Sequence, residues 1–156
     1  MQSYTFKVPQ KPQGKGRGRA FNTPKGVRVR TPGKTRNYEA LVADVAAQAM
    51  DGGPMLRGPL GLKLLAVFPR SQHLARCSKR DGKPMESTDR LPYGGLPDLD
   101  NVIKAICDAI EGTMLKNDSR IVIVHAAKMY SLMALQAGHW CEERPHVQVT
   151  VSEVMP

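Results

Sequence analysis

The sequence PDLDNVIKAICDAIEG runs from Pro97 to Gly112 and predicts the central helix of the protein. Pro97 and Asp98 form a helix start signal, and Gly112 is a stop signal. The apolar residues between them recur at helical spacing, which indicates one buried stripe. That stripe consists of Leu99, Val102, Ile103, Ile106 and Ile110.

The opposite face of this helix carries Asp100, Lys104, Asp108 and Glu111. One interpretation is a solvated face with an Asp100–Lys104 ion pair, which contributes about 0.3–0.5 kcal/mol. Asp98 favours another interpretation. If it caps the helix from an extended backbone, its carboxylate need not point away from Asp100, as two helical steps of about 100° would require. Two acids at a helix start, with a lysine one turn on, then indicate a site for a hard cation and a phosphate.

The composition predicts one globular domain over residues 1–156, with 41% hydrophobic residues to form a core. Aromatic residues make up only 5%, which argues against extensive base stacking on single strands. No apolar run approaches the ~18 residues of a membrane span, and no apolar signal segment or nucleotide-binding glycine motif is present. We therefore expect a cytoplasmic protein with reduced cysteines, no membrane partner and no small-molecule cofactor.

The net charge of +9 belongs to the N-terminal segment. Ten of the 23 basic residues lie within the first 36 positions, which hold no acid. Residues 9–33 are also rich in Gly and Pro, which indicates an arm that orders on a polyanionic partner. A solubilising tail is the alternative. The arm residues and their neighbours predicted to contact nucleic-acid phosphates are Lys15, Arg17, Arg19, Lys25, Arg28, Arg30, Lys34 and Arg36.

Alternating apolar residues predict strands at residues 3–8, 60–68 and 146–152. The β-branched run Ile121–Val124 is typical of a strand covered on both faces. Residues 132–143 fit either a continuation of that strand with a loop or a short helical turn. Both alternatives remain open on the sequence alone.

A first helix is predicted after Thr31-Pro32, with an apolar stripe from Tyr38 to Ala49. Residues 70–97 are polar and rich in Gly and Pro, which predicts a long flap loop leading directly into Asp98. We expect an α/β (α+β) fold in a single small two-layer domain. Its mixed sheet has the element order β-α-β-α-β-β, with both helices on one face.

The run Asp98-Leu99-Asp100-Asn101 is followed by Lys104, Asp108 and then Asn117-Asp118, which precede a Val/Ile strand ending near Lys128-Met129. Together these positions resemble the RusA family of Holliday-junction resolvases. The segment Thr31–Glu39 resembles the beginning of that family's first helix. The β-α-β-α-β-β order agrees with the family's fold.

This resemblance implies a homodimeric crossover junction endodeoxyribonuclease that cleaves four-way DNA junctions in recombination and repair. It implies dependence on Mg²⁺, with Mn²⁺ as a substitute. By position, Asp98, Asp100 and Asp118 match the family's catalytic acids and would bind the metal. Lys104 matches its essential lysine, and Asp108 is a candidate supporting residue.

The residue types agree with phosphodiester hydrolysis, because carboxylates that bind Mg²⁺ allow the ion to activate water and neutralise phosphate charge. Two other functions remain. One is a metal-dependent nuclease acting on flaps, forks or RNA. The other is a catalytically silent DNA-binding or architectural protein, although phosphate binding alone gains nothing from three clustered carboxylates.

Overall fold

The computed structural model describes residues 1–16, 18–24, 26–30 and 32–154, with the backbone alone at residues 19, 21 and 28–30. Four strands form a mixed sheet in the order β1–β8–β4–β5, in which only β4 and β5 are parallel. They are β1 (Ser3–Val8), β4 (Leu60–Phe68), β5 (Ile121–Tyr130) and β8 (His146–Glu153).

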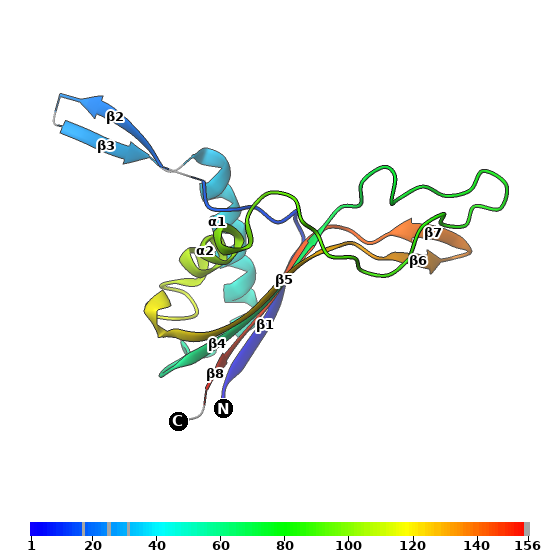
Figure 1. Cartoon of the computed structure of the whole chain (residues 1–156). Coiled ribbons are helices and arrows are strands. Elements are labelled where there is room, and N and C mark those ends of the chain that lie inside the picture. Colours follow the sequence, from blue (N-terminus) through cyan, green and yellow to red (C-terminus); the bar gives the residue numbers. More distant parts are fainter. Residues whose placement is uncertain (17, 25, 31, 155–156) are drawn as a thin grey trace.

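Both helices, α1 (Gly33–Met50) and α2 (Leu99–Ile110), cover one face of this sheet (Figure 1). The predicted stripe of α2 is confirmed at Val102, Ile106 and Ile110, all fully buried. Alternate residues of β4 and β8 meet the helices, as expected for a sheet with one covered face. The core therefore lies between the sheet and the two helices, and it fixes where α2 begins.

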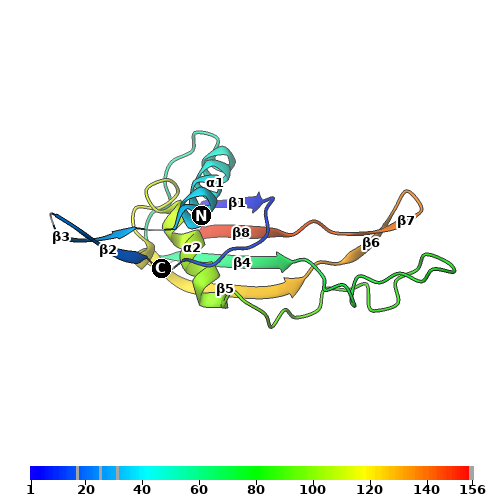
Figure 2. The same ribbon diagram turned by 90° about the horizontal axis from the view of Figure 1, so that it is seen from above.

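The predicted two-layer α+β domain is confirmed, with two helices and a mixed sheet. The element order is longer than predicted, because two hairpins are inserted into the chain. The first joins β2 (Arg19–Thr23) to β3 (Gly26–Arg30), and the second joins β6 (Met133–Gln136) to β7 (His139–Glu142). They project from opposite ends of the molecule (Figures 1 and 2).

The prediction of a loop over residues 9–33 is wrong for the β2–β3 hairpin. Gly26 adopts a φ of 106°, which favours glycine and lets the chain turn back. Strand prediction depends on an apolar alternation that marks a buried face, and Val27 of this hairpin is 67% exposed.

The prediction that β5 is covered on both faces is also wrong. β5 is the edge strand of the sheet, and Val122, Ile123 and Val124 are 60%, 42% and 45% exposed. A run of β-branched residues favours an extended backbone but does not show that the strand is buried.

Residues 133–142 form the β6–β7 hairpin, which matches neither predicted alternative. Its turn places Ala137 at a φ of 48°, a conformation that an alanine does not signal in advance.

The flap over residues 70–97 has no helix or strand of its own, as predicted, and it extends in the same direction as the β6–β7 hairpin (Figures 1 and 2). Cys77 in the flap, Cys107 in α2 and Cys141 in β7 are all free thiols. Burial raises the pKa of Cys107 to about 11, so this thiol is a small core residue. Across the described residues, no helix is long and apolar enough to span a bilayer.

Candidate active site

The carboxylates of Asp98 and Asp100 lie at the start of α2. Asp98 precedes the helix with an extended backbone (φ −63°, ψ 150°), the condition under which its carboxylate need not point away from Asp100. Its carbonyl accepts a hydrogen bond from the Val102 amide at 3.1 Å. Its side chain makes no capping hydrogen bond, and both carboxylates are exposed. Neither acid is therefore committed to stabilising the helix end.

The chain just before Asp98 is held by Lys128, on the helix-covered side of β5. The Lys128 ammonium donates to the carbonyls of Gly95 at 2.6 Å and Pro97 at 2.8 Å. It also lies 5.4 Å from the ring centre of Tyr93, which stacks on Phe68. Sequence reasoning missed this role. A lysine at an inward position of a strand was the available signal, since lysine is seldom placed there without partners.

Lys104 joins α2 to the beginning of β5. Its ammonium lies 2.9 Å from Oδ2 of Asp118 and 2.7 Å from Oδ1 of Asp108. Asp118 opens a short 3₁₀ turn (Asp118–Arg120), fixed by an Asn117 side chain that accepts from the Ser119 amide at 2.8 Å. The expected Asp100–Lys104 ion pair is replaced by these two contacts.

The two contacts hold Lys104 in its charged form. Hydrogen bonds to Asp108 and Asp118 raise the pKa of the Lys104 ammonium well above its ordinary value. An ammonium has three N–H donors, so one remains beyond the two carboxylates. The side chain is 54% exposed, which makes that donor accessible from solvent.

Asp108 is shared between two lysines. Its second oxygen, Oδ2, lies 2.6 Å from Nζ of Lys15, which also contacts Oε1 of Glu39 at 2.5 Å. Burial by itself raises the pKa of Asp108, but the hydrogen bonds from Lys104 and Lys15 outweigh burial and lower it. We call these five residues, Glu39, Lys15, Asp108, Lys104 and Asp118, the site network.

The structure thus brings Lys104, Asp108 and Asp118 into direct contact, with Asp98 and Asp100 at the start of the same helix. Within the described ranges of the chain, no three His, Cys, Asp or Glu side chains lie close enough together to form a metal site. Mg²⁺ does not require such a group, because it keeps several waters and binds through one or two carboxylates together with substrate phosphate. The exposed carboxylates therefore fit Mg²⁺ by their chemistry.

An open groove of about 810 Å³ runs alongside the start of α2. Residues 10–16 form one wall, and the first turns of α1 and α2 form the other. Lys11 and Lys34 line it together with Asp98 and Asn101. The groove therefore combines the positive charge that a phosphate backbone requires with one of the candidate catalytic acids.

The eight predicted phosphate contacts have different placements. Lys34 and Arg36 are exposed in the first turn of α1, and Lys15 lies in the site network. The hairpin backbone carries Arg19, Arg28 and Arg30, with Arg19 opposite Arg30 in the strand register. Arg17 and Lys25 lie outside the described residues.

A second polar cluster lies at the base of the flap, where Arg70 is only 6% exposed. Its guanidinium donates to the carbonyls of Ser131 and Ser87, each at 2.6 Å, to Leu74 at 3.3 Å, and to Asp89. These carbonyls belong to both halves of the flap and to the end of β5. Arg70 therefore ties the flap to the sheet.

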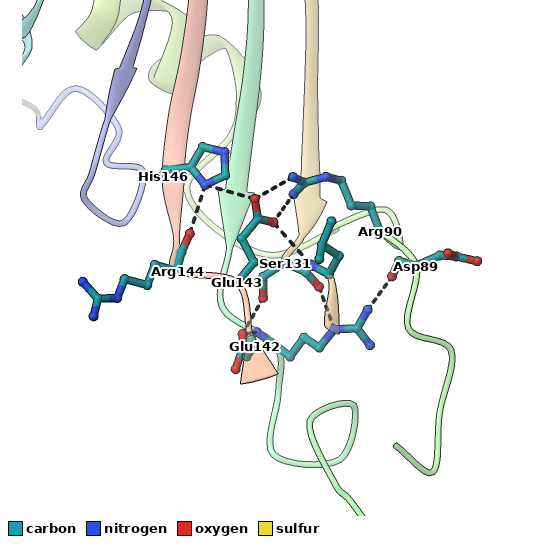
Figure 3. Close-up of polar contacts among 9 residues, drawn as sticks. Asp89, Arg90, Ser131, Glu142, Glu143, Arg144 and His146 are labelled. Atoms are coloured by element: carbon teal, nitrogen blue, oxygen red, sulfur yellow. Dashed lines mark hydrogen bonds and ion pairs between the residues drawn. The ribbon is translucent and has the colours of Figure 1, made fainter. Parts of the chain in front are cut away.

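Two glutamates of β7 and its following loop complete this cluster (Figure 3). Glu142 accepts from the Arg70 amide at 2.6 Å and from the Ser131 hydroxyl. Glu143 forms a two-point ion pair with Arg90 at 2.8 and 2.7 Å, and lies 3.7 Å from the buried His146 ring. We call Arg70, Arg90, Ser131, Glu142 and Glu143 the flap-base cluster.

The fold and the site define a basic α+β protein with a carboxylate–lysine site beside a charged groove. A family model described as "Endodeoxyribonuclease RusA" matches residues 9–152. The chain belongs to this RusA endodeoxyribonuclease family, as its motifs had indicated. It is also 27% identical to a Bacillus subtilis (strain 168) protein named "Uncharacterized protein YqaN", over 99% of each chain.

Proposed function

We propose that this protein is a Mg²⁺-dependent endonuclease that cleaves four-way DNA junctions as a homodimer, acting in the cytoplasm in DNA recombination and repair. The observation that carries the proposal is the contact between Lys104 and Asp118 at 2.9 Å. It joins two motifs 14 residues apart, one of them on the helix that begins at the exposed acids Asp98 and Asp100. Membership of an endodeoxyribonuclease family supports the same reaction class.

In this proposal Asp98, Asp100 and Asp118 are the candidate metal carboxylates. Because no three such side chains lie close together in the described residues, one or two of them would bind the ion together with the substrate phosphate. Mn²⁺ would substitute for Mg²⁺. When bound, the ion supplies activation of the attacking water and neutralisation of phosphate charge. Lys104 donates its remaining N–H to the scissile phosphate and stabilises the negative charge that develops there. The oxygen of water forms the new bond to phosphorus, and the bond to the departing sugar oxygen breaks.

The proposed DNA contacts are divided between the two ends of the molecule (Figures 1 and 2). At one end lie the groove and the β2–β3 hairpin with its arginines. At the other, the flap tip exposes Arg76, Lys79, Arg80 and Lys83 around a single acid, Asp81. A two-fold dimer would present two such surfaces and two sites to the opposed strands of a junction. Affinity should then fall steeply with salt, because each phosphate contact releases counterions.

The test is cleavage of a labelled four-way junction against a linear duplex of the same sequence, with and without Mg²⁺. Wild type should nick the junction in symmetric pairs. Asp100→Asn should bind the junction with unchanged affinity but cut it at least 100-fold more slowly, since one metal carboxylate is lost. Asp44→Asn removes an exposed carboxylate from the body of α1 and should cut normally.

The other outcomes decide between the alternatives. Faster cleavage of flaps, forks or RNA of matched length would replace the junction as substrate while keeping the metal chemistry. Junction binding by wild type without cleavage in Mg²⁺ or Mn²⁺ would favour an architectural protein. Salt-insensitive junction binding would contradict the phosphate contacts of the arm and flap.

A further inference from the structure

A chain of alternating charges connects α1 and the N-terminal arm to the candidate catalytic lysine. It runs from Glu39 through Lys15, Asp108 and Lys104 to Asp118, with every link between 2.5 and 2.9 Å. Asp108 is the central member, because each of its two oxygens contacts a different lysine. Lys15 and Asp108 are mostly buried, with 29% and 19% of their side chains exposed, so water weakens this link less than a surface ion pair.

The backbone of the arm is held so that Lys15 faces Asp108. The Lys15 amide donates to the carbonyl of Asn101 in α2 at 2.9 Å. A Cβ on Gly14 would lie 2.8 Å from Cβ of Pro97, and a Cβ on Gly16 would lie 2.6 Å from Oγ1 of Thr35. Only glycine on either side of Lys15 permits this close approach to both helices.

We propose that Lys15 is a positioning residue for Lys104 and acts through Asp108. By binding one oxygen of Asp108, Lys15 fixes the other oxygen against Lys104. Lys15 also neutralises the negative charge of the Asp108 carboxylate. Lys104 then keeps an effective positive charge and a fixed direction for its third N–H donor. This inference rests on the proposed function, since Lys104 is the group that meets the phosphate.

The competing role for Lys15 is a direct phosphate contact, as the basic arm first indicated. Two of its three N–H donors already contact Glu39 and Asp108, and its side chain is 29% exposed against 54% for Lys104, so the third donor is less accessible to a phosphate. The two roles predict different measurements. A direct contact contributes to junction affinity, whereas a positioning residue contributes to the rate of the bound complex.

The experiment measures junction Kd and the single-turnover cleavage rate at saturating protein for Lys15→Met. The rate should fall roughly 10- to 100-fold through misplacement of Lys104, with Kd unchanged within about twofold. Lys15→Arg, which keeps the charge, should recover part of the rate. Lys7→Met, an exposed lysine of β1, is the matched control and should change neither quantity. A weaker Kd with an unchanged rate would overturn the inference.

A double mutant tests the route. If Lys15 acts through Asp108, Lys15→Met should cost little further rate in an Asp108→Asn background. Independent, multiplicative losses would contradict that route.

A readout independent of cleavage separates this inference from the proposed function. The ¹H–¹⁵N signal of the Lys104 ammonium should be observable in wild type, because its protons are held in hydrogen bonds. Lys15→Met should shift or broaden it, whereas Lys7→Met should leave it unchanged. If wild type cuts no junction but the signal responds, only the proposed function fails. If the junction is cut and the signal ignores Lys15, the positioning role fails.

Discussion

The site network and the flap-base cluster are built from the same residue types, but they use their donors differently. In the site network, Lys104 is 54% exposed and keeps one N–H donor beyond its two carboxylate partners. In the flap-base cluster, Arg70 is 6% exposed and its guanidinium donates to four backbone carbonyls. The site network exposes a donor to a further anion, whereas the Arg70 guanidinium of the flap-base cluster is enclosed by the carbonyls it binds.

This difference shows how the protein separates stability from chemistry. A buried cation that donates to four backbone carbonyls fixes the path of a long loop that has no helix or strand to hold it. An exposed cation with an unused donor adds little to stability but is available to a substrate. The clearest way to break the comparison is to remove each cation and to measure stability and cleavage on the same variants.

Arg70→Met should have the largest effect on stability. Methionine fills a similar volume but donates no hydrogen bonds, so the carbonyls of Ser87, Ser131, Asp89 and Leu74 lose their common partner. We expect the free energy of unfolding to fall by about 3–5 kcal/mol, as for loss of a buried charged partner. Urea unfolding measures this loss, and limited proteolysis should show cleavage first in the flap.

Arg76→Met is the matched control for that change, because Arg76 is an exposed flap arginine. Its stability should lie within about 0.5 kcal/mol of wild type. Equal stability of the Arg70 and Arg76 variants would show that the flap-base cluster is not what holds the flap.

Lys104→Ala should show the opposite pattern. Loss of a donor to the developing phosphate charge is expected to slow single-turnover junction cleavage about 10²–10³-fold. Stability should change by less than about 1 kcal/mol, since exposed ion pairs contribute little. Lys63→Ala, on an exposed position of β4, is the control for loss of a lysine. A variant that cuts at the normal rate would remove Lys104 from the proposed chemistry.

The sequence predicted the local parts of this site well. The extended backbone at Asp98, the buried stripe of α2 and the irregular flap all follow from residues close together in the chain, where periodicity and start signals operate. It also assigned Lys104 and Asp118 to one site, but only through a family resemblance, and it did not predict their contact, because spacing alone does not join a helix to a residue 14 positions on.

The missed features are those that long-range contacts create. Lys15 was assigned to phosphate contact with the rest of the arm, since composition does not reveal that Asn101 and Asp108 hold it against α2. Lys128 and Arg70 were likewise ordinary basic residues in sequence. Their carbonyl partners belong to loops that become neighbours only in the fold, and a carbonyl acceptor leaves no mark in the sequence.

Lowering the pH should have the smallest of these effects, and it should destabilise the flap-base cluster and the site network to different extents. Although burial alone raises the pKa of Glu143, its hydrogen bonds with Arg90 outweigh burial and lower it below the ordinary value of 4.5. The unfolded chain therefore binds this proton first as the pH falls, so unfolding becomes easier. The stabilisation is complete above about pH 4.5 and is lost as the pH falls through the lower pKa of the folded state.

Urea unfolding from pH 7 to pH 3 measures this dependence. Glu143→Gln should remove the part of the acid-induced stability loss that is due to Glu143, while lowering stability at pH 7.

Asp108 has a lowered pKa for the same kind of reason, since the hydrogen bonds from Lys104 and Lys15 outweigh the effect of burial. Its contribution should disappear only below its ordinary value of 3.8. The loss at the flap-base cluster should therefore begin at a higher pH, below about 4.5, than the loss at the site network, which should begin below about 3.8. If both contributions to stability were lost at the same pH, the two clusters would not be independent, because one shared unfolding step would control them.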